Sequence, residues 1–185
     1  MKLWEKDKSG NKLKINLKKN LKIGILGGTF DPAHKGHINI SKESIKRFNL
    51  NFIIWAITKK NPFKSRSSLN LKSRINFARK ITSKEKFIKV GYYEKKIKSN
   101  KTINLISHFK NNHVYFIMGA DNLINFHKWH KWKLISKKCN ILVFDRQGYR
   151  AKSLKSITFK QLNKKNFNFI KFKKVNISSS KLRKI

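Results

Sequence analysis

The apolar residues of this chain fall into short runs that alternate with segments of helical spacing. Ile23–Leu26 is an apolar run that ends at Gly27-Gly28, which predicts a buried strand that stops at a tight turn. Pro32 marks the expected start of a helix, because Lys35–Phe48 carries apolar and small side chains at helical spacing. Phe52–Ile57 is a second apolar run. A strand, a helix and a strand within about 35 residues form a βαβ unit, which implies a parallel sheet.

The alternation continues along the rest of the chain with less regular patterning. Further strands are expected at residues 87–92, 114–118, 141–144 and 169–175, and further helices at 69–81 and 102–109. A polar loop at 58–68 and a long stretch without clear periodicity at 145–168 separate these elements. The predicted fold is a single α/β domain of residues 22–185, with a Rossmann-like, doubly wound parallel sheet.

Residues 1–21 differ from the rest of the chain. They are rich in Lys and Asn, and no apolar periodicity predicts an element there. They also lack the apolar stretch of a signal peptide. We expect these residues to form a basic, flexible and solvated arm.

The formal net charge of +38 is extreme for a chain of 185 residues. Such a field attracts polyanions, so nucleic-acid binding is one interpretation. The alternative is a compositional bias, because Lys, Asn, Ile and Phe all have AT-rich codons. Lysines occur in every segment rather than in one stripe, which favours the bias. We therefore expect non-specific polyanion binding at low salt and no specific nucleic-acid partner.

Cysteine content and hydropathy exclude further classes. Cys139 is the single cysteine, so no intramolecular disulfide can form, which is typical of a reducing compartment. No apolar stretch approaches the roughly 18 residues that span a bilayer. We expect a cytoplasmic protein without a membrane partner.

The first chemical motif is Gly27-Gly28-Thr29-Phe30-Asp31-Pro32-Ala33-His34-Lys35-Gly36-His37, where the first predicted strand meets its helix. Ligands of open α/β sheets bind outside the carboxyl ends of the strands, and glycines let the backbone approach a phosphate. His34 and His37 are three residues apart, so both project from one face of the first helical turn, where anions are attracted. Two imidazoles there can each donate a hydrogen bond to a phosphate oxygen.

Each part of this motif also has an ordinary alternative. A Gly-Gly pair usually marks only a turn, and a histidine is often a surface or core residue. A zinc site is a further alternative, but two histidines by themselves make a poor set of zinc ligands. We therefore predict no metal ligands among the protein side chains.

The second motif is Ile177-Ser178-Ser179-Ser180-Lys181-Leu182-Arg183. Ser178 or Ser179 is a natural N-cap, so an ordinary helix start is one interpretation. Lys181 and Arg183 then fall in the first turns, where positive side chains oppose the helix dipole. A bound anion would remove that conflict, and Arg183 is informative because arginine is scarce in this chain.

The third segment runs from Gly119 to Trp132. Asp121 lies just beyond a predicted strand, where it could accept hydrogen bonds from ribose hydroxyls or cap a helix. Trp132 is expected to anchor a helix in the core. Trp129 could do the same, or it could stack on a flat heteroaromatic ring.

The first two motifs resemble those of the nucleotidyltransferase superfamily. The first matches Gly-Gly-Thr-Phe-Asp-Pro-x-His-x-Gly-His throughout, and the second is similar to Ile-Ser-Ser-Thr-x-Ile-Arg, with Ser180 and Leu182 as replacements. The third segment, followed by Arg146-Gln147-Gly148-Tyr149, is similar to nicotinate-nucleotide adenylyltransferases. The loop at 61–64 and the helix that holds Arg74 also fall where that family has theirs.

This resemblance implies a set of substrate-binding residues. The implied ATP-binding residues are Gly27, Gly28, Thr29, Phe30, His34, His37, Asp121, Ile177, Ser178, Ser179, Ser180 and Arg183. The implied acceptor-binding residues are Thr29, Thr102 and Trp129, with Trp129 stacked on the pyridine ring, although Asn100-Lys101 precede Thr102 where the family has Ser-Tyr. His34, His37 and Arg183 would be catalytic, and Mg²⁺ would arrive on the phosphates of ATP.

The implied reaction joins AMP from ATP to nicotinate mononucleotide and gives deamido-NAD and pyrophosphate, a step of NAD biosynthesis. The 5′-phosphate of the acceptor would attack the α-phosphorus of ATP in line. Alternative acceptors are nicotinamide mononucleotide, phosphopantetheine and a polyol phosphate. A further alternative is an inactive relative that binds nucleic acid, whose binding would fall steeply with salt.

Overall fold

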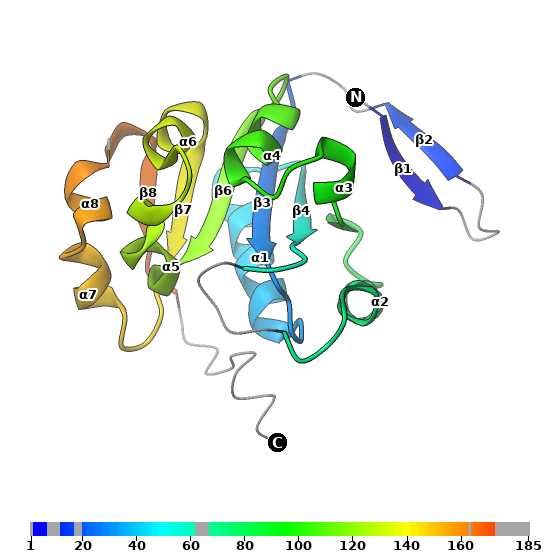
Figure 1. Ribbon diagram of the computed structural model, residues 1–185, viewed down its shortest axis with the longest axis horizontal. Helices are drawn as coiled ribbons and strands as arrows, with labels where there is room; N and C mark the ends of the chain where they lie inside the picture. The colour runs from blue at the N-terminus through cyan, green and yellow to red at the C-terminus, as the bar shows by residue number, and fades with distance from the viewer. Residues whose placement is uncertain (1, 7–11, 17–19, 62–66, 163, 173–185) are drawn as a thin grey trace.

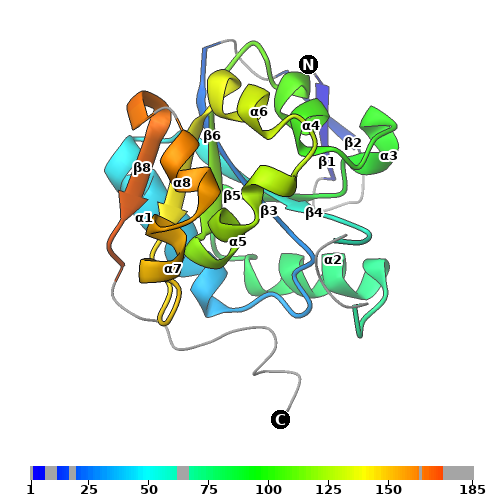
Figure 2. The same cartoon turned by 60° about the vertical axis from the view of Figure 1, so that its left-hand side comes forward.

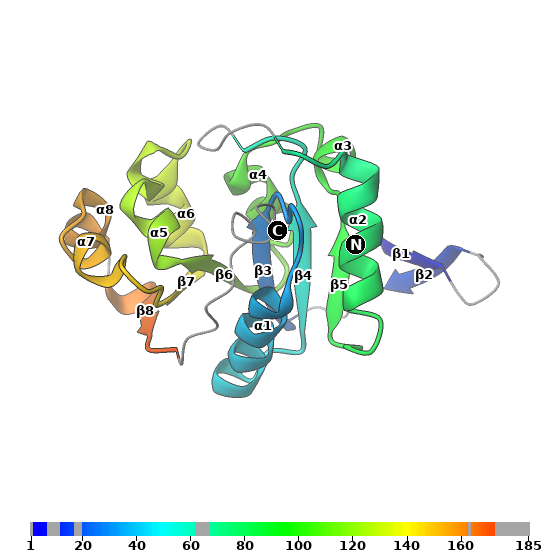
Figure 3. The same ribbon diagram turned by 90° about the horizontal axis from the view of Figure 1, so that it is seen from below.

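The computed structural model describes residues 2–6, 12–16, 20–61, 67–162 and 164–172. Six parallel strands form one sheet in the order β5-β4-β3-β6-β7-β8 (Figures 1 and 3). These strands are β3 (Lys22–Gly28), β4 (Phe52–Ile57), β5 (Ile88–Gly91), β6 (His113–Gly119), β7 (Asn140–Phe144) and β8 (Phe167–Ile170). The strand order reverses direction between β3 and β6, which confirms the predicted doubly wound, Rossmann-like sheet.

Helices cover both faces of this sheet. The core on one face includes side chains from α1 (Lys35–Phe48) and α2 (Leu71–Ile81). The core on the other face is built with the short helices α4 (Thr102–His108), α5 (Ala120–Ile124), α6 (Trp132–Lys138) and α8 (Ile157–Gln161). Figure 3 shows α1 and α4 on opposite sides of the central strands. The remaining elements are α3 (Glu94–Ile97), α7 (Arg150–Leu154) and the 3-10 turns η1 (Phe126–Lys128) and η2 (Lys164–Asn166).

The central strands are buried on both faces, which explains why their sequences read as unbroken apolar runs. In β4 every residue from Ile53 to Ile57 is buried, and Trp55 has no exposed surface. A parallel sheet with helices on both sides has no solvated face, so its strands do not alternate between polar and apolar positions. The predicted bounds of β4 are therefore confirmed. The observed β6 is one residue longer than predicted at each end, and β7 is one residue longer at its start.

The N-terminal part contains two strands where the sequence predicted none. Lys2–Lys6 (β1) pairs antiparallel with Lys12–Asn16 (β2), for example Leu3 opposite Ile15. The segment Lys12–Asn16 does alternate polar and apolar residues, but the surrounding lysines hid that short period. The main sheet begins at Lys22, the residue predicted to begin the folded domain.

Three other boundaries differ from the expectation. The helix after β3 begins at Lys35 rather than at Pro32, because His34 provides the cap. Similarly, Asn70 accepts a hydrogen bond from the Ser73 N–H at 2.9 Å, so α2 begins at Leu71. The last described strand is β8, and the predicted strand 169–175 overlaps it only in part and runs beyond the described residues.

The stretch 145–168 is not irregular. It holds α7 and α8, which lie beside α5 (Figure 2). Both helices have five residues, too few to show a full helical period in the sequence.

Within the described ranges, no helix is long and apolar enough to cross a membrane. Cys139 is buried, and burial raises the pKa of its thiol to about 12, so the group is inert in this fold.

The close packing of β3 gives a test of the fold. A methyl group at Gly24 would meet Ile53 Cγ1 at 2.9 Å and Ile117 Cδ1 at 3.0 Å. We expect Gly24→Ala to lower the free energy of unfolding by about 1–3 kcal/mol, measured by urea denaturation. The control is Gly27→Ala, whose methyl group would meet only Phe116, at 3.7 Å. Equal stability of the two variants would contradict this account.

Candidate active site

The turn after β3 lies at the carboxyl edge of the sheet, next to the switch point between β3 and β6. It contains Phe30, which adopts a left-handed backbone with φ 50°. This conformation costs a non-glycine residue on the order of 1–2 kcal/mol. The Phe30 ring is buried and stacks on Trp55 at 4.9 Å between centroids, so packing in the core holds the strained turn.

His34 and His37 meet at the start of α1, as their spacing predicted. The imidazole of His34 is the N-cap of the helix, and its Nδ1 accepts a hydrogen bond from the Gly36 N–H at 3.1 Å. In return, Nδ1 of His37 accepts a hydrogen bond from the His34 N–H at 3.2 Å. The two rings lie 3.9 Å apart between centroids. This is a capping box built from two histidines in place of the usual hydroxyl and carboxylate.

These hydrogen bonds assign the protonation of both rings. A ring nitrogen that accepts from a backbone N–H carries no proton, so in the neutral ring the proton resides on Nε2. Burial, and secondly the charge of Arg146, lower the pKa of His34 to about 4. His34 is therefore neutral at pH 7 and can still donate one hydrogen bond from Nε2. The first turn of α1 has no acidic residue, so its positive end is available to an anion.

Asp121 pairs with Arg146 across the ends of β6 and β7. Nη1 of Arg146 donates to Oδ2 of Asp121 at 2.6 Å. Asp121 is the second residue of α5, and Gly119 occupies the N-cap position, so the alternative of Asp121 as a helix cap is wrong. A methyl group at Gly119 would lie 2.5 Å from Oδ1 of Asp121, so this glycine makes room for the carboxylate.

Both tryptophans of the third segment pack on the core. Trp129 follows η1, and its half-buried ring meets Phe126 and Phe116 edge-on at 5.3 and 6.0 Å. Trp132 begins α6 and is also half-buried. Its ring packs edge-on against that of Phe126, with 6.1 Å between the ring centroids. The expected core anchor is thus seen for Trp132. Trp129 shares that packing while part of its ring surface is still exposed.

The other residues implied by the resemblance lie at the start of α4, at the end of β3 and in the C-terminal motif. Thr102 is the first residue of α4 and is half-buried, and no side-chain cap precedes it at Lys101. Gly27 and Gly28 end β3, with the Gly28 carbonyl accepting from the Thr58 N–H at 2.9 Å. The second motif, Ile177, Ser178, Ser179, Ser180 and Arg183, lies outside the described residues.

The sequence assigned no role to two buried residues of this region, Asp31 and Arg74. Asp31 is 2% exposed and accepts hydrogen bonds from the N–H groups of Ser68 and Leu69 at 2.8 and 3.1 Å. Arg74 is also 2% exposed, and its guanidinium binds main-chain carbonyls of the same loops, including that of Thr29. Scarcity of arginine was the available signal for Arg74, as it was for Arg183.

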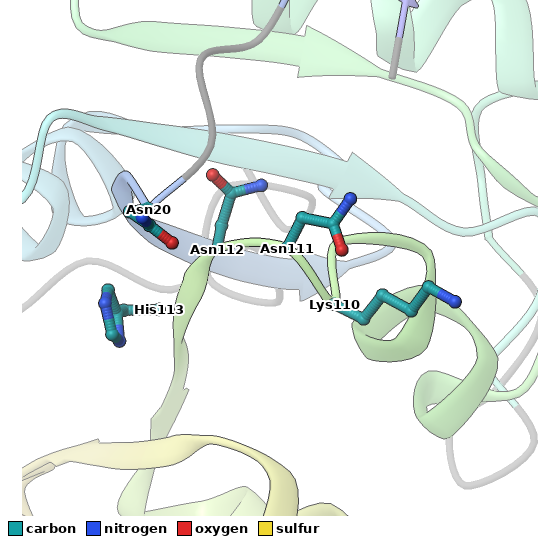
Figure 4. Close-up of a pocket in the computed structure, with 5 residues that line it drawn as sticks. All are labelled: Asn20, Lys110, Asn111, Asn112 and His113. Atoms are coloured by element: carbon teal, nitrogen blue, oxygen red, sulfur yellow. The ribbon is translucent and has the colours of Figure 1, made fainter.

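A separate hollow of about 300 Å³ lies at the opposite end of the sheet. Its lining is polar and consists of Asn20, Lys110, Asn111, Asn112 and His113 (Figure 4). Asn20 precedes β3 and His113 begins β6, so the hollow lies at the amino ends of the strands. It is therefore distinct from the histidine site. Among the described residues, no three His, Cys, Asp or Glu side chains are grouped to hold a metal ion.

Comparison with known proteins gives the family of the chain. Residues 25–185 match the cytidylyltransferase-like family, the class of protein that this fold and site define. The chain is 66% identical to the "Probable nicotinate-nucleotide adenylyltransferase" of Pelagibacter ubique (strain HTCC1062), over 92% of this chain and 96% of the relative. A protein of the same name from Agrobacterium fabrum (strain C58) is 40% identical over 72% of this chain and 74% of its own length. The chain therefore belongs to the nicotinate-nucleotide adenylyltransferase family.

Solved structures support the fold. The nicotinic acid mononucleotide adenylyltransferase of Plasmodium falciparum, complexed with APC, superimposes with a TM-score of 0.72. The same protein complexed with NaAD gives the same score. In each case the alignment covers 89% of this chain and 83% of the other, at 20% identity.

The lowered pKa of His34 predicts how stability depends on pH. The unfolded chain takes up this proton near pH 6.5, whereas the folded protein resists it until about pH 4. Protonation therefore favours the unfolded state, and stability falls as the pH drops from 6.5 towards 4. We expect His34→Asn, which keeps a capping side chain, to lose less stability over this range in denaturation curves. Parallel curves for the variant and the wild type would contradict the assignment.

Proposed function

We propose that this protein transfers AMP from ATP to nicotinate mononucleotide and releases pyrophosphate. The observation that carries the proposal is the histidine capping box, which lies inside a motif identical to the superfamily pattern. It offers two Nε2 donors and a helix N-terminus at one point of the sheet edge. That arrangement is suited to the triphosphate of ATP. The names of the relatives support nicotinate mononucleotide as the acceptor.

The residues of the turn would bind the nucleotide phosphates. The turn from Gly27 to Phe30 would approach them through its backbone, while His34 and His37 donate from Nε2. As the bond to pyrophosphate stretches, negative charge grows on the leaving oxygens, and these donors stabilise it without moving. The 5′-phosphate of the acceptor would attack the α-phosphorus in line.

Charge at the neighbouring strand ends adds to this site. Arg146 is close enough to His34 to lower its pKa, so its guanidinium adds positive potential where the phosphates would bind. Asp121, held by Arg146, would accept hydrogen bonds from the ribose hydroxyls. Ile177, Ser178, Ser179, Ser180 and Arg183 complete the proposed ATP site on the basis of their motif alone.

A divalent cation belongs to the same proposal. The described part of the chain offers no cluster of three acidic or histidine ligands, so the proposed Mg²⁺ is carried by phosphate oxygens and water. When bound there, Mg²⁺ neutralises part of the phosphate charge.

The acceptor site would lie beside the nucleotide, between the turn and the third segment. The half-buried ring of Trp129 would stack on the pyridine, and Thr102 at the start of α4 would lie near its carboxylate. Thr29 would contact the acceptor from the turn. A cytoplasmic location completes the proposal, since ATP is present there and the single Cys139 forms no intramolecular disulfide.

The direct test is pyrophosphate release by purified protein with ATP, Mg²⁺ and one of three acceptors. We expect nicotinate mononucleotide to be used in preference to nicotinamide mononucleotide and phosphopantetheine. Preference for phosphopantetheine would show that the role proposed for Trp129 is wrong. No release with any acceptor at moderate salt would refute the proposed activity and favour nucleic-acid binding.

Two substitutions of His34 separate its roles in the helix and in the reaction. His34→Ala removes the cap and should lower the free energy of unfolding by about 1 kcal/mol, whereas His34→Asn should keep it. Both remove the Nε2 donor, so we expect turnover to fall in both by about 100-fold or more. Denaturation and steady-state rates measure the two effects. Normal turnover in His34→Asn would contradict the phosphate role.

A further inference from the structure

Arg74 is a buried cation whose guanidinium donates hydrogen bonds to main-chain carbonyls around the site. Its Nη1 donates to the carbonyls of Thr29 at 2.6 Å and Thr58 at 2.9 Å. Its Nη2 donates to the Lys59 carbonyl at 3.1 Å, and Nε donates to the Leu69 carbonyl at 3.1 Å. One side chain from α2 therefore binds the loop after β3, the loop after β4 and the residues before its own helix.

A buried guanidinium is costly unless charges and acceptors surround it. Burial lowers the pKa of Arg74, and the carboxylates of Asp31 and then Glu94 raise it again. The arginine stays charged, because its ordinary pKa lies far above neutrality. Burying a charged side chain is unfavourable compared with burying an aliphatic one of similar size. We therefore expect Arg74 to make contacts that matter for structure or function and that an aliphatic side chain could not make.

The contact with Thr29 fixes more than one oxygen. The Thr29 carbonyl and the Phe30 N–H belong to one planar peptide group, and in a trans peptide they point in opposite directions. Holding the carbonyl against the buried guanidinium therefore directs the Phe30 N–H away from it. This peptide lies within the Gly27–Phe30 turn, next to the strained φ of Phe30.

The carboxylate partners hold the adjacent loops in the same way. Glu94 of α3 accepts hydrogen bonds from the Thr58 hydroxyl and from the Lys59 N–H at 3.3 Å. The peptide between Thr58 and Lys59 is thus held at its carbonyl by Arg74 and at its N–H by Glu94. Asp31 fixes Ser68 and Leu69 just before α2. Through these hydrogen bonds, Asp31, Arg74 and Glu94 connect the segments that follow β3, β4 and β5.

We propose that Arg74 is a positioning residue for the transfer reaction: it sets the direction of the Thr29–Phe30 peptide, and so prepares the turn that receives the ATP phosphates. This inference rests on the proposed function. Lysine cannot replace it, because an ammonium group lacks the planar fork that reaches several carbonyls at once. In a chain where most cations are lysines, an arginine at this buried position fits that requirement.

The test compares Arg74→Lys with two variants of the same helix. Arg79→Lys makes the same exchange at an exposed position. Ala78→Gly destabilises α2 at a buried position without changing a side chain that contacts the loops. At a temperature where all three are folded, we expect Arg74→Lys to lower kcat about 100-fold. The KM for the acceptor should change much less. Both controls should stay within about twofold of the wild type.

A purely structural role of Arg74 would give another pattern. Arg74→Lys would then resemble Ala78→Gly, with a lower unfolding temperature and an unchanged kcat, and the proposal would be overturned. If Arg74→Lys does not fold, Glu94→Gln takes its place, because Glu94 is half-buried and supports the same peptide. We expect kcat about tenfold lower in that variant, and an unchanged kcat would also overturn the proposal.

A second readout separates this inference from the proposed function. If wild-type protein releases no pyrophosphate with any acceptor, the proposed function fails on its own. The affinity for a non-hydrolysable ATP analogue, measured by calorimetry, then decides the role of Arg74. Weaker binding by Arg74→Lys than by Ala78→Gly supports the positioning of the turn, and equal affinities refute it.

Discussion

The start of α1 is the constraint on which the site depends. The first N–H groups of a helix have no partner within the helix, and here two imidazoles accept hydrogen bonds from the N–H groups of His34 and Gly36. The same bonds occupy Nδ1 of both rings and leave Nε2 as the proton-bearing nitrogen. One set of interactions therefore begins the helix, places the two rings 3.9 Å apart and selects the tautomer that can donate to a phosphate.

The turn before this helix shows how the fold supports a strained site. Phe30 has an unfavourable backbone conformation that three interactions hold in place. Its ring stacks on Trp55 and packs against His37, with 4.8 Å between the centroids of the Phe30 and His37 rings. The third interaction is the hydrogen bond from Arg74 to the Thr29 carbonyl. Trp55 in turn donates to the Ser41 hydroxyl at 2.9 Å, which donates to the His37 carbonyl at 2.8 Å. Packing beneath the turn thus supports the position of His37.

The charge of the chain is large, but only part of it is organised. The sequence has 46 basic and 8 acidic residues, and the lysines are spread over all segments. Each acidic side chain described between Asp31 and Asp145 has a hydrogen bond or ion pair; these are Asp31, Glu43, Glu85, Glu94, Asp121 and Asp145. Four of them, Asp31, Glu94, Asp121 and Asp145, lie just beyond the carboxyl ends of β3, β5, β6 and β7. The rare acids, rather than the abundant lysines, therefore mark the site.

The sequence alone determined the parallel sheet, the principal helices and the motif at His34 and His37, because buried strands and capped turns need particular residues close together in the chain. It did not show the pairing of Asp121 with Arg146, which are 25 residues apart and meet only where β6 and β7 end side by side. Nor did it show the role of Arg74, whose carbonyl partners carry no side-chain signal. The hairpin of β1 and β2 was missed because its period is short and masked by lysines. Contacts through the backbone and between distant loops exist only once the sheet has brought them together, so the tertiary structure alone decided them.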